Sequence, residues 1–227
     1  MLKKYAFAFI FPLLIACENS EQQNSEETEE VTQSTVLEDT PVEKEVKKVE
    51  NPFLLENMLK ITDEAMLKTK YGAENVTRET QVFAEGTVEL EVTLLFKGTE
   101  KELRFMWEDD SVNFAIPTSL FVETKNSPWV TSNGIKVGTS MTELEEIYNS
   151  DFSFYGFGWD FGGMVIFDKN KIVEKSINLT LGACSDADYD KPEYTRLLGD
   201  NEFKTSSSDA QTFNPCVIGL EVHSPVE

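Results

Sequence analysis

The stretch FYGFGWDFGG, from Phe154 to Gly163, contains residue types that bind ligands. Aromatic rings stack on the apolar faces of sugars and peptides, and a nearby carboxylate can accept their hydrogen bonds. One interpretation is therefore an exposed platform made by Tyr155 and Trp159, with Asp160 as the acceptor. This surface would bind a glycan or a peptide.

The same stretch also has the composition of a packed strand. On a straight strand over 152–162, Phe157 and Trp159 share one face, and glycines dominate the other face. Glycines within strands mark bends or the close approach of another backbone. Aromatic runs are mostly core, so we favour packing of these two rings against a helix that carries Leu144 and Tyr148.

A second candidate is the acidic stretch with Asp186, Asp188 and Asp190 at alternate positions. Hard cations such as calcium are bound by carboxylates at this spacing. The calcium-loop pattern fails, because Lys191 stands where glycine is required and Leu197 where glutamate is required. We expect an exposed, solvated loop that binds divalent cations only weakly.

Motifs of catalysis are absent from the sequence. It has no G-x-S-x-G, H-E-x-x-H, P-loop or dinucleotide pattern, and its single histidine, His223, lies near the C-terminus. Glycoside hydrolysis by a pair of carboxylates stays an alternative, because many Asp and Glu residues are available to form the pair. We favour a noncatalytic role without a cofactor.

The N-terminus has the pattern of an export signal. Lys3 and Lys4 precede an apolar segment over 5–16 that is too short to span a bilayer. The sequence Leu14-Ile15-Ala16-Cys17 resembles the lipobox of bacterial lipoproteins. The resemblance implies a signal peptide over 1–16, a diacylated Cys17 and attachment to the cell envelope. Glu18, in place of aspartate, favours the outer membrane, on either of its faces.

Residues 17–51 are rich in Glu, Gln, Asn, Ser and Thr and contain no aromatic residue. Such a segment buries too little surface to offset its ordering entropy, so we predict a disordered acidic tether. The whole chain has a net charge of -21. The negative electrostatic field of such a chain argues against binding to nucleic acid or to anionic lipid headgroups.

Two cysteines remain once Cys17 is assigned to lipid. Cys184 and Cys216 are then a pair in an exported protein, and disulfides persist in oxidising compartments. We predict a disulfide between them.

Helix signals occur twice. Thr62-Asp63-Glu64 begins a predicted helix over 62–71, and Ser140 and Glu143 form a capping box for a helix over 140–149. The two predicted helices share a loose sequence pattern, Thr-x4-Leu-x3-Tyr. Its residues are Thr62, Leu67 and Tyr71 in the first half and Thr139, Leu144 and Tyr148 in the second.

Strand signals follow each helix. Residues 88–96 alternate apolar and polar side chains, and the alternation continues through 103–107. In the second half, 164–167 and 172–181 predict a hairpin with a turn at 168–170, and 216–222 predicts a last strand. The expected fold class is α+β, with one or two units of a helix followed by an antiparallel meander.

The stretch Gly134-Ile135-Lys136-Val137-Gly138-Thr139-Ser140, followed by Glu143 and Leu144, resembles the helix entry of small BamE-type lipoproteins. Two such units in tandem are similar to the β-lactamase inhibitor protein. The resemblance implies a first α+β unit over 52–127 and a second over 128–227, the latter with a disulfide-closed loop.

Two functions follow as hypotheses. The first is a noncatalytic envelope lipoprotein that binds a protein partner or assists assembly. The second is a glycan-binding or glycan-processing envelope protein that uses Tyr155 and Trp159.

Overall fold

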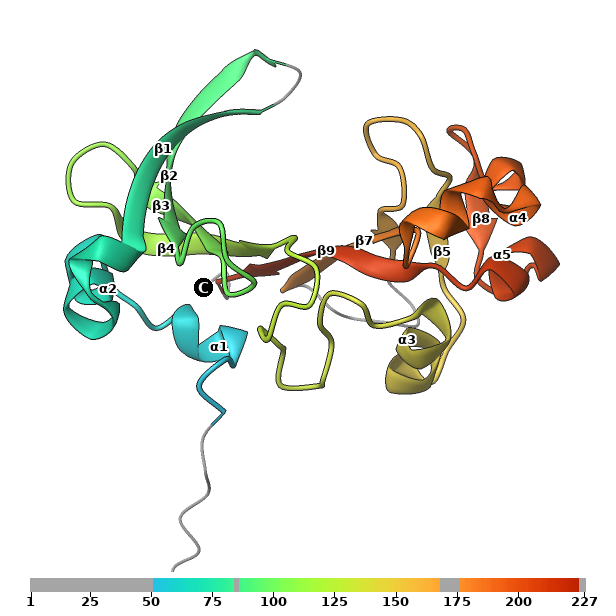
Figure 1. Ribbon diagram of the computed structural model, residues 1–227, viewed down its shortest axis with the longest axis horizontal. Coiled ribbons are helices and arrows are strands. Elements are labelled where there is room, and N and C mark those ends of the chain that lie inside the picture. The colour runs from blue at the N-terminus through green and yellow to red at the C-terminus, as the bar shows by residue number, and fades with distance from the viewer. Residues whose placement is uncertain (1–50, 84–85, 168–175, 225–227) are drawn as a thin grey trace, which may run out of the picture. The chain divides into compact units, whose positions relative to one another are not determined.

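The fold is α+β and contains two antiparallel sheets (Figure 1). The computed structural model describes residues 51–83, 86–167 and 176–224. The expected signal peptide, Cys17 and the tether up to residue 50 lie outside these residues. The helices and short helical turns are α1 (Leu55–Met58), α2 (Glu64–Tyr71), η1 (Ala73–Asn75), α3 (Met141–Tyr148), η3 (Asp186–Asp190), α4 (Pro192–Arg196) and α5 (Ser208–Phe213). The strands are β1 (Val76–Phe83), β2 (Val88–Leu95), β3 (Leu103–Asp109), β4 (Ala115–Val122), β5 (Ser153–Tyr155), β6 (Val165–Ile166), β7 (Ile177–Gly182), β8 (Glu202–Lys204) and β9 (Cys216–His223).

Both predicted helices are confirmed, and their ends have local causes. The Asp63 side chain accepts the Met66 N–H at the start of α2, and Gly72, at φ 91°, ends that helix. At α3, Ser140 and Glu143 form the predicted capping box. Asn149 ends α3 in the left-handed conformation, which asparagine tolerates better than most residues.

The larger sheet has the strand order β1-β2-β3-β4-β9-β7, and the smaller has the order β6-β5-β8. Strands from both expected units share the larger sheet, because β9 pairs with β4 as well as with β7. The chain from Val49 onward forms one compact unit. A tandem repeat is not seen.

The predicted hairpin between 164–167 and 172–181 is wrong for the residues that the structure describes. β6 pairs with β5 in the smaller sheet, and β7 pairs with β9 in the larger one. A single bridge between Met164 and Thr180 links the two sheets. The expected turn at 168–170 lies outside the described residues.

β2 differs from the half-buried strand that its alternation predicts. Val88 and Glu89 are exposed, whereas all four residues from Val92 to Leu95 are buried. The reason is the pairing with β3, which involves only Thr93–Leu95 of β2. The first part of β2 pairs with β1 alone and extends beyond the sheet (Figure 1).

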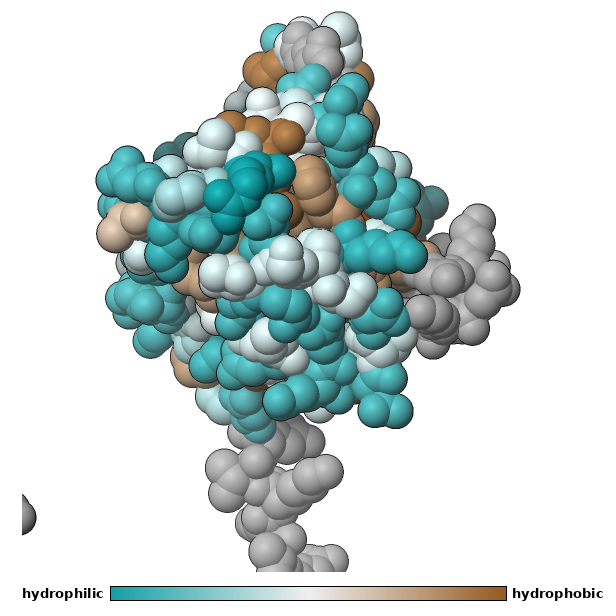
Figure 2. Space-filling view, turned by 90° about the vertical axis from the view of Figure 1, so that its right-hand side faces the viewer, coloured by the Kyte–Doolittle hydropathy of each residue, from teal (hydrophilic) through white to brown (hydrophobic). Residues whose placement is uncertain are grey.

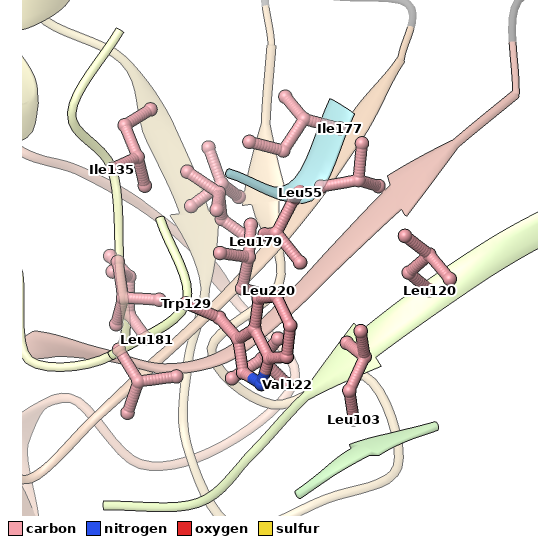
Figure 3. Packing of buried hydrophobic residues seen from close by; sticks show 14 of the residues in the cluster. Leu55, Leu103, Leu120, Val122, Trp129, Ile135, Ile177, Leu179, Leu181 and Leu220 are labelled. Carbon is pink, nitrogen blue, oxygen red and sulfur yellow. The ribbon is translucent and has the colours of Figure 1, made fainter. Parts of the chain in front are cut away.

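The core cluster contains buried side chains from both sheets and from α1, α2, α3 and α5. In Figure 1, α1 and α3 lie below the larger sheet. Figure 3 shows the buried side chains converging, with the Trp129 indole among them. Trp129 is 1 % exposed, and its indole N–H donates to the carbonyl of Lys101 at 2.8 Å. This bond satisfies the ring's one polar group inside an otherwise apolar cluster.

Candidate functional site

The aromatic stretch forms a tight turn, which corrects the expectation of a straight strand over 152–162. β5 ends at Tyr155, and the chain reverses before β6. Tyr155 donates its N–H to the Met164 carbonyl at 3.0 Å and accepts the Gly163 N–H at 2.8 Å. We call the segment from Tyr155 to Met164 the aromatic turn. In Figure 1 it is the loop that follows β5.

Glycines allow the turn to pack against its neighbours. A Cβ atom on Gly163 would lie 1.9 Å from the Leu181 carbonyl oxygen, and Gly163 has a φ of +81°. A Cβ atom on Gly156 would lie 2.4 Å from the Gly199 carbonyl oxygen. No side chain fits at such distances, so these glycines are required by close backbone approach.

Phe157 points into the core, as the packing interpretation predicts, but against different elements. Its ring stacks on Tyr194 of α4, with centroids 5.4 Å apart, and contacts Phe213 of α5 at 5.8 Å. Tyr148 of α3 contacts the rings of Phe152 and Phe167 instead. The ring contacts of Phe157 are therefore with α4 and α5 rather than with Tyr148 of α3.

Trp159 and Tyr155 belong to a second, partly exposed group of rings. Trp159 contacts Tyr155 at 5.6 Å and Phe161 at 5.4 Å, with interplanar angles of 85° and 73°. The Trp159 indole N–H donates to the Gly156 carbonyl at 2.8 Å, which fixes the ring on the turn. Asp160 is exposed beside these rings.

The three rings of this group differ in exposure. Phe161 is 53 % exposed, while Tyr155 and Trp159 are half-buried. The rings meet edge to face, so they do not form one flat platform of the kind a sugar face stacks on. An exposed aromatic side chain on a hydrogen-bonded turn suits insertion into an apolar pocket of another protein.

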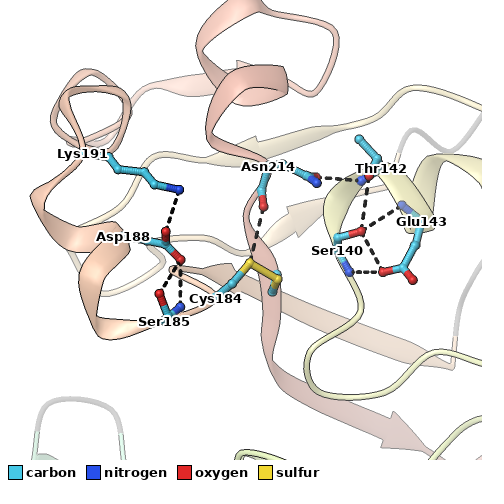
Figure 4. The surroundings of a disulfide bond; sticks show 9 residues. Ser140, Thr142, Glu143, Cys184, Ser185, Asp188, Lys191 and Asn214 are labelled. Carbon is cyan, nitrogen blue, oxygen red and sulfur yellow. Dashed lines mark hydrogen bonds and ion pairs between the residues drawn. A yellow bond between two sulfur atoms is a disulfide. The ribbon is translucent and has the colours of Figure 1, made fainter.

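The predicted disulfide between Cys184 and Cys216 is confirmed, with Cα atoms 5.0 Å apart (Figure 4). It joins the start of β9 to the segment before η3. The Asn214 carbonyl lies 3.4 Å from Cys184 Sγ, and the Asn214 side chain accepts the Thr142 N–H at 3.1 Å. The disulfide therefore lies where α5, β9 and the N-terminus of α3 meet.

The acidic stretch forms η3. Asp186 and Asp190 are exposed, as predicted, but the Asp188 side chain is only 14 % exposed. Its carboxylate accepts the N–H and hydroxyl of Ser185, both at 2.9 Å, and pairs with Lys191 at 2.6 Å (Figure 4). These hydrogen bonds, from Lys191 first and then Ser185, lower the pKa of the Asp188 carboxyl. The carboxylate caps a helical turn, which sequence spacing did not indicate.

Two hollows border these elements, and the sequence indicated neither. A groove of about 560 Å³ runs beside the disulfide, with Lys125, Lys136 and Tyr189 in its walls. A more apolar cleft of about 290 Å³ lies between Leu59, directly after α1, and Val222 of β9. Their walls come from segments far apart in the chain, so no local pattern could predict them.

Glu64 is a buried charge that the sequence analysis also missed. It is 2 % exposed, and Arg78 and Lys68 bind its carboxylate. Thr93 donates to the same carboxylate at 3.2 Å and accepts the Trp107 indole N–H at 2.9 Å. Burial raises the pKa of Glu64, but the hydrogen bonds from Arg78 and Lys68 outweigh it and lower the pKa overall. This network joins α2 to β1, β2 and β3.

His223, the one histidine of the sequence, ends β9. Its ring lies 2.8 Å from the Asn178 amide and 3.3 Å from the Glu221 carboxylate. Within 51–83, 86–167 and 176–224, no three Asp, Glu, His or Cys side chains gather as a metal-binding group. Over the same ranges, no helix has the length and apolar character needed to cross a bilayer.

Comparisons with protein-family models, with curated proteins and with solved structures found no match for this chain. The function proposed below therefore depends on the residues and geometry of this protein alone.

Proposed function

We propose that this protein is a lipid-anchored envelope protein that binds a protein partner without catalysis. The lipobox-like sequence that ends at Cys17 supports the anchor, and the acidic segment after it supports a tether. The aromatic turn supports the binding role. Its exposed Phe161 is the single observation on which this role depends.

The aromatic turn has the properties of an interface hot spot. Tyr and Trp are enriched at such sites, because they offer a large contact area at a small entropic cost. Here the hydrogen bond from Trp159 and the close packing of Gly156 and Gly163 fix the turn before any partner arrives. A fixed surface loses less entropy on binding than a mobile loop does.

A glycan-binding role is the alternative, and the geometry supports it less. Small ligands and sugars bind in concave sites, whereas these rings meet edge to face and Phe161 is exposed to solvent. A protein partner can supply the concave surface instead.

Site-specific photo-crosslinking in cells tests the proposal. We expect a photoreactive phenylalanine analogue at position 161 to give a discrete protein adduct. The matched control is the same analogue at position 189, because Tyr189 is 50 % exposed and aromatic but lies outside the turn. Equal adducts at both positions would contradict a partner site on the turn.

The Phe161→Ser variant provides the complementary measurement. Because Phe161 is exposed, we expect the variant to keep its thermal midpoint while the partner is no longer co-purified. A glycan array probed with both forms covers the alternative. Glycan binding that Phe161→Ser abolishes would assign the turn to a sugar.

A further inference from the structure

The hairpin of β1 and β2 continues beyond the larger sheet as a two-stranded ribbon. Thr80–Phe83 of β1 pairs in regular register with Val88–Glu91 of β2, and β3 pairs with β2 only from Thr93 onward. We call these two four-residue segments the β-arm. Figure 1 shows the β-arm extending away from β3 and β4.

A free two-stranded ribbon is marginally stable in water, and three or more strands are needed for independent stability. The β-arm nevertheless exposes large apolar side chains: Val82 is 57 % exposed and Val88 is 40 % exposed. Figure 2 shows apolar surface on the upper projection of the molecule, where the β-arm ends. An added strand would supply the missing support.

The outer edge of β1 is open to such a strand. β1 is the terminal strand of its sheet, and no other strand among the described residues pairs with that edge. Proteins usually protect edges with charged side chains, proline or bulges. β1 has no proline and no bulge, and its charged residues, Arg78 and Glu79, lie outside the β-arm. At the opposite end of the sheet, β7 is partly covered, because Leu181 donates its N–H to the Gly163 carbonyl at 2.7 Å.

The two faces of the β-arm differ in chemistry. Thr80 lies opposite Glu91 and Val82 opposite Glu89, so one face carries both carboxylates. The other face carries Gln81, Phe83, Val88 and Leu90, because Gln81 lies opposite Leu90 and Phe83 opposite Val88. The β-arm contains no Lys or Arg.

Among the described residues, Glu89 and Glu91 form no ion pair, and the Glu91 carboxylate accepts the Thr80 hydroxyl. Arg78 is the nearest basic residue of β1, but it binds Glu64, and its guanidinium lies 3.5 Å from the Phe114 ring centroid. The hollow of about 560 Å³ beside this face is bordered by three carboxylates, Glu89, Glu91 and Asp110, and by one cation, Arg78. A strand that arrives here therefore meets negative charge on one face and apolar side chains on the other.

We propose that the outer edge of β1 accepts an extended segment of a protein partner as an added strand, with basic and apolar residues in alternation. Successive side chains of a strand point to opposite faces. The basic residues would then lie over the acidic face, within reach of Glu89 and Glu91 because Lys and Arg are long. The apolar residues would lie beside Phe83 on the other face. This surface is separate from the aromatic turn.

Titration of the full-length protein with an eight-residue peptide of alternating lysine and valine tests the inference. We expect saturable NMR shift changes of the β1 amides, while the aromatic turn stays unchanged. Two control peptides are matched to the probe. One has glutamate in place of lysine, and the other has methyl groups on alternate amide nitrogens, which remove the donors for strand pairing.

We expect both control peptides to bind at least roughly tenfold more weakly than the probe. The glutamate peptide loses the charge attraction, and the methylated peptide loses the hydrogen bonds of strand pairing. Equal binding of the methylated peptide would overturn the inference, as would shift changes away from β1 or no saturable change at millimolar peptide. Shift changes of β1 that depend on protein concentration alone would assign the edge to a second copy and would also overturn it.

Protein variants separate this surface from general electrostatics. The double variant Glu89→Lys/Glu91→Lys should bind the lysine–valine peptide at least roughly tenfold more weakly than the unmodified protein does. The matched control, Glu146→Lys/Glu202→Lys, makes the same charge change at exposed positions of α3 and β8 and should bind like the unmodified protein. Equal losses of peptide affinity in both variants would show that the effect comes from net charge alone, and this would overturn the inference. Phe161→Ser should leave the peptide affinity unchanged, which distinguishes this surface from the aromatic turn.

Discussion

The carboxylate of Glu64, at the start of α2, is bound by the guanidinium of Arg78 on β1. Glu64 is almost fully buried, so its charge depends on Arg78 and Lys68 for compensation. Removing the carboxylate while Arg78 remains would leave a cation without its partner next to the core. Charged hydrogen bonds of this kind stabilise proteins by about 1.5–3 kcal/mol.

We expect Glu64→Gln to lower the free energy of unfolding by about 1–3 kcal/mol, measured by urea unfolding at neutral pH. The control is Glu79→Gln, which breaks the more exposed pair between Glu79, the residue after Arg78 on β1, and Lys97, which follows β2. An exposed pair contributes about 0.2–1 kcal/mol, so the control should lose less. Equal losses would contradict the role of the buried network.

The same network predicts a pH dependence. The pKa of Glu64 is lower in the folded protein than its ordinary value of 4.5, so the unfolded chain binds the proton more tightly. Its contribution is fully present above pH 4.5 and is lost as the pH falls through the folded pKa. The stability difference between the unmodified protein and Glu64→Gln should therefore shrink in acid. A difference that stays constant from neutral pH to pH 3 would disprove this.

The disulfide should contribute measurably to stability. Removing it with Cys184→Ala/Cys216→Ala should lower the free energy of unfolding by about 3–4 kcal/mol, because the unfolded chain gains the freedom of the opened loop. The unmodified protein in reductant should match the double variant. Mass spectrometry of the non-reduced protein should give one linked pair of peptides. Unfolding that reductant does not affect would argue against a stabilising disulfide.

The aromatic turn should tolerate no side chain at Gly163. We expect Gly163→Ala to destabilise by about 2–4 kcal/mol, since it combines a left-handed backbone with a clash against Leu181. The control is Gly134→Ala, because Gly134 has a φ of +92° but no atom within 4 Å of an added Cβ. It isolates the backbone cost of about 1 kcal/mol. Thermal unfolding of both variants measures the difference.

The lipid anchor can be tested by fractionation. Cys17→Ser should release the protein from membranes or leave an uncleaved precursor, because the acyl chains would have no attachment site. Cys216→Ser should stay in the membrane fraction, which controls for the loss of a cysteine. Normal membrane retention of Cys17→Ser would refute the anchor.

Calcium should bind η3 only weakly. The Asp188 carboxylate already accepts hydrogen bonds from Ser185 and pairs with Lys191, and no glycine lies in this stretch to bring more oxygens together. Calorimetry should give a dissociation constant of about 10⁻⁴ to 10⁻³ M or weaker. A micromolar constant that Asp188→Asn abolishes would show a real calcium site.

Elements with strong local signals were predictable from the sequence. Cap residues such as Asp63 and Ser140 located α2 and α3, because capping depends on neighbours in the chain. Alternation located β3 and β9, and the count of cysteines predicted the disulfide.

Elements that depend on distant partners were not predictable. β1 has mostly polar residues and is a strand because β2 pairs with it along its whole length. β4 contains Pro117, which is tolerated because it lies opposite Trp107 at a bulge and outside the pairing with β9. The buried state of Glu64 depends on Thr93, 29 residues away, and has no local signal. The reversal of the aromatic turn depends on β7, which lies beyond it in the chain.

The place of β9 in the sheet also has a consequence for biogenesis. β9 is the last element of the chain, yet it lies between β4 and β7 inside the larger sheet. A growing chain that has not yet reached β9 lacks the strand that joins these two neighbours and the cysteine that pairs with Cys184. The larger sheet therefore stays divided, and its disulfide unformed, until the residues of β9 have been made.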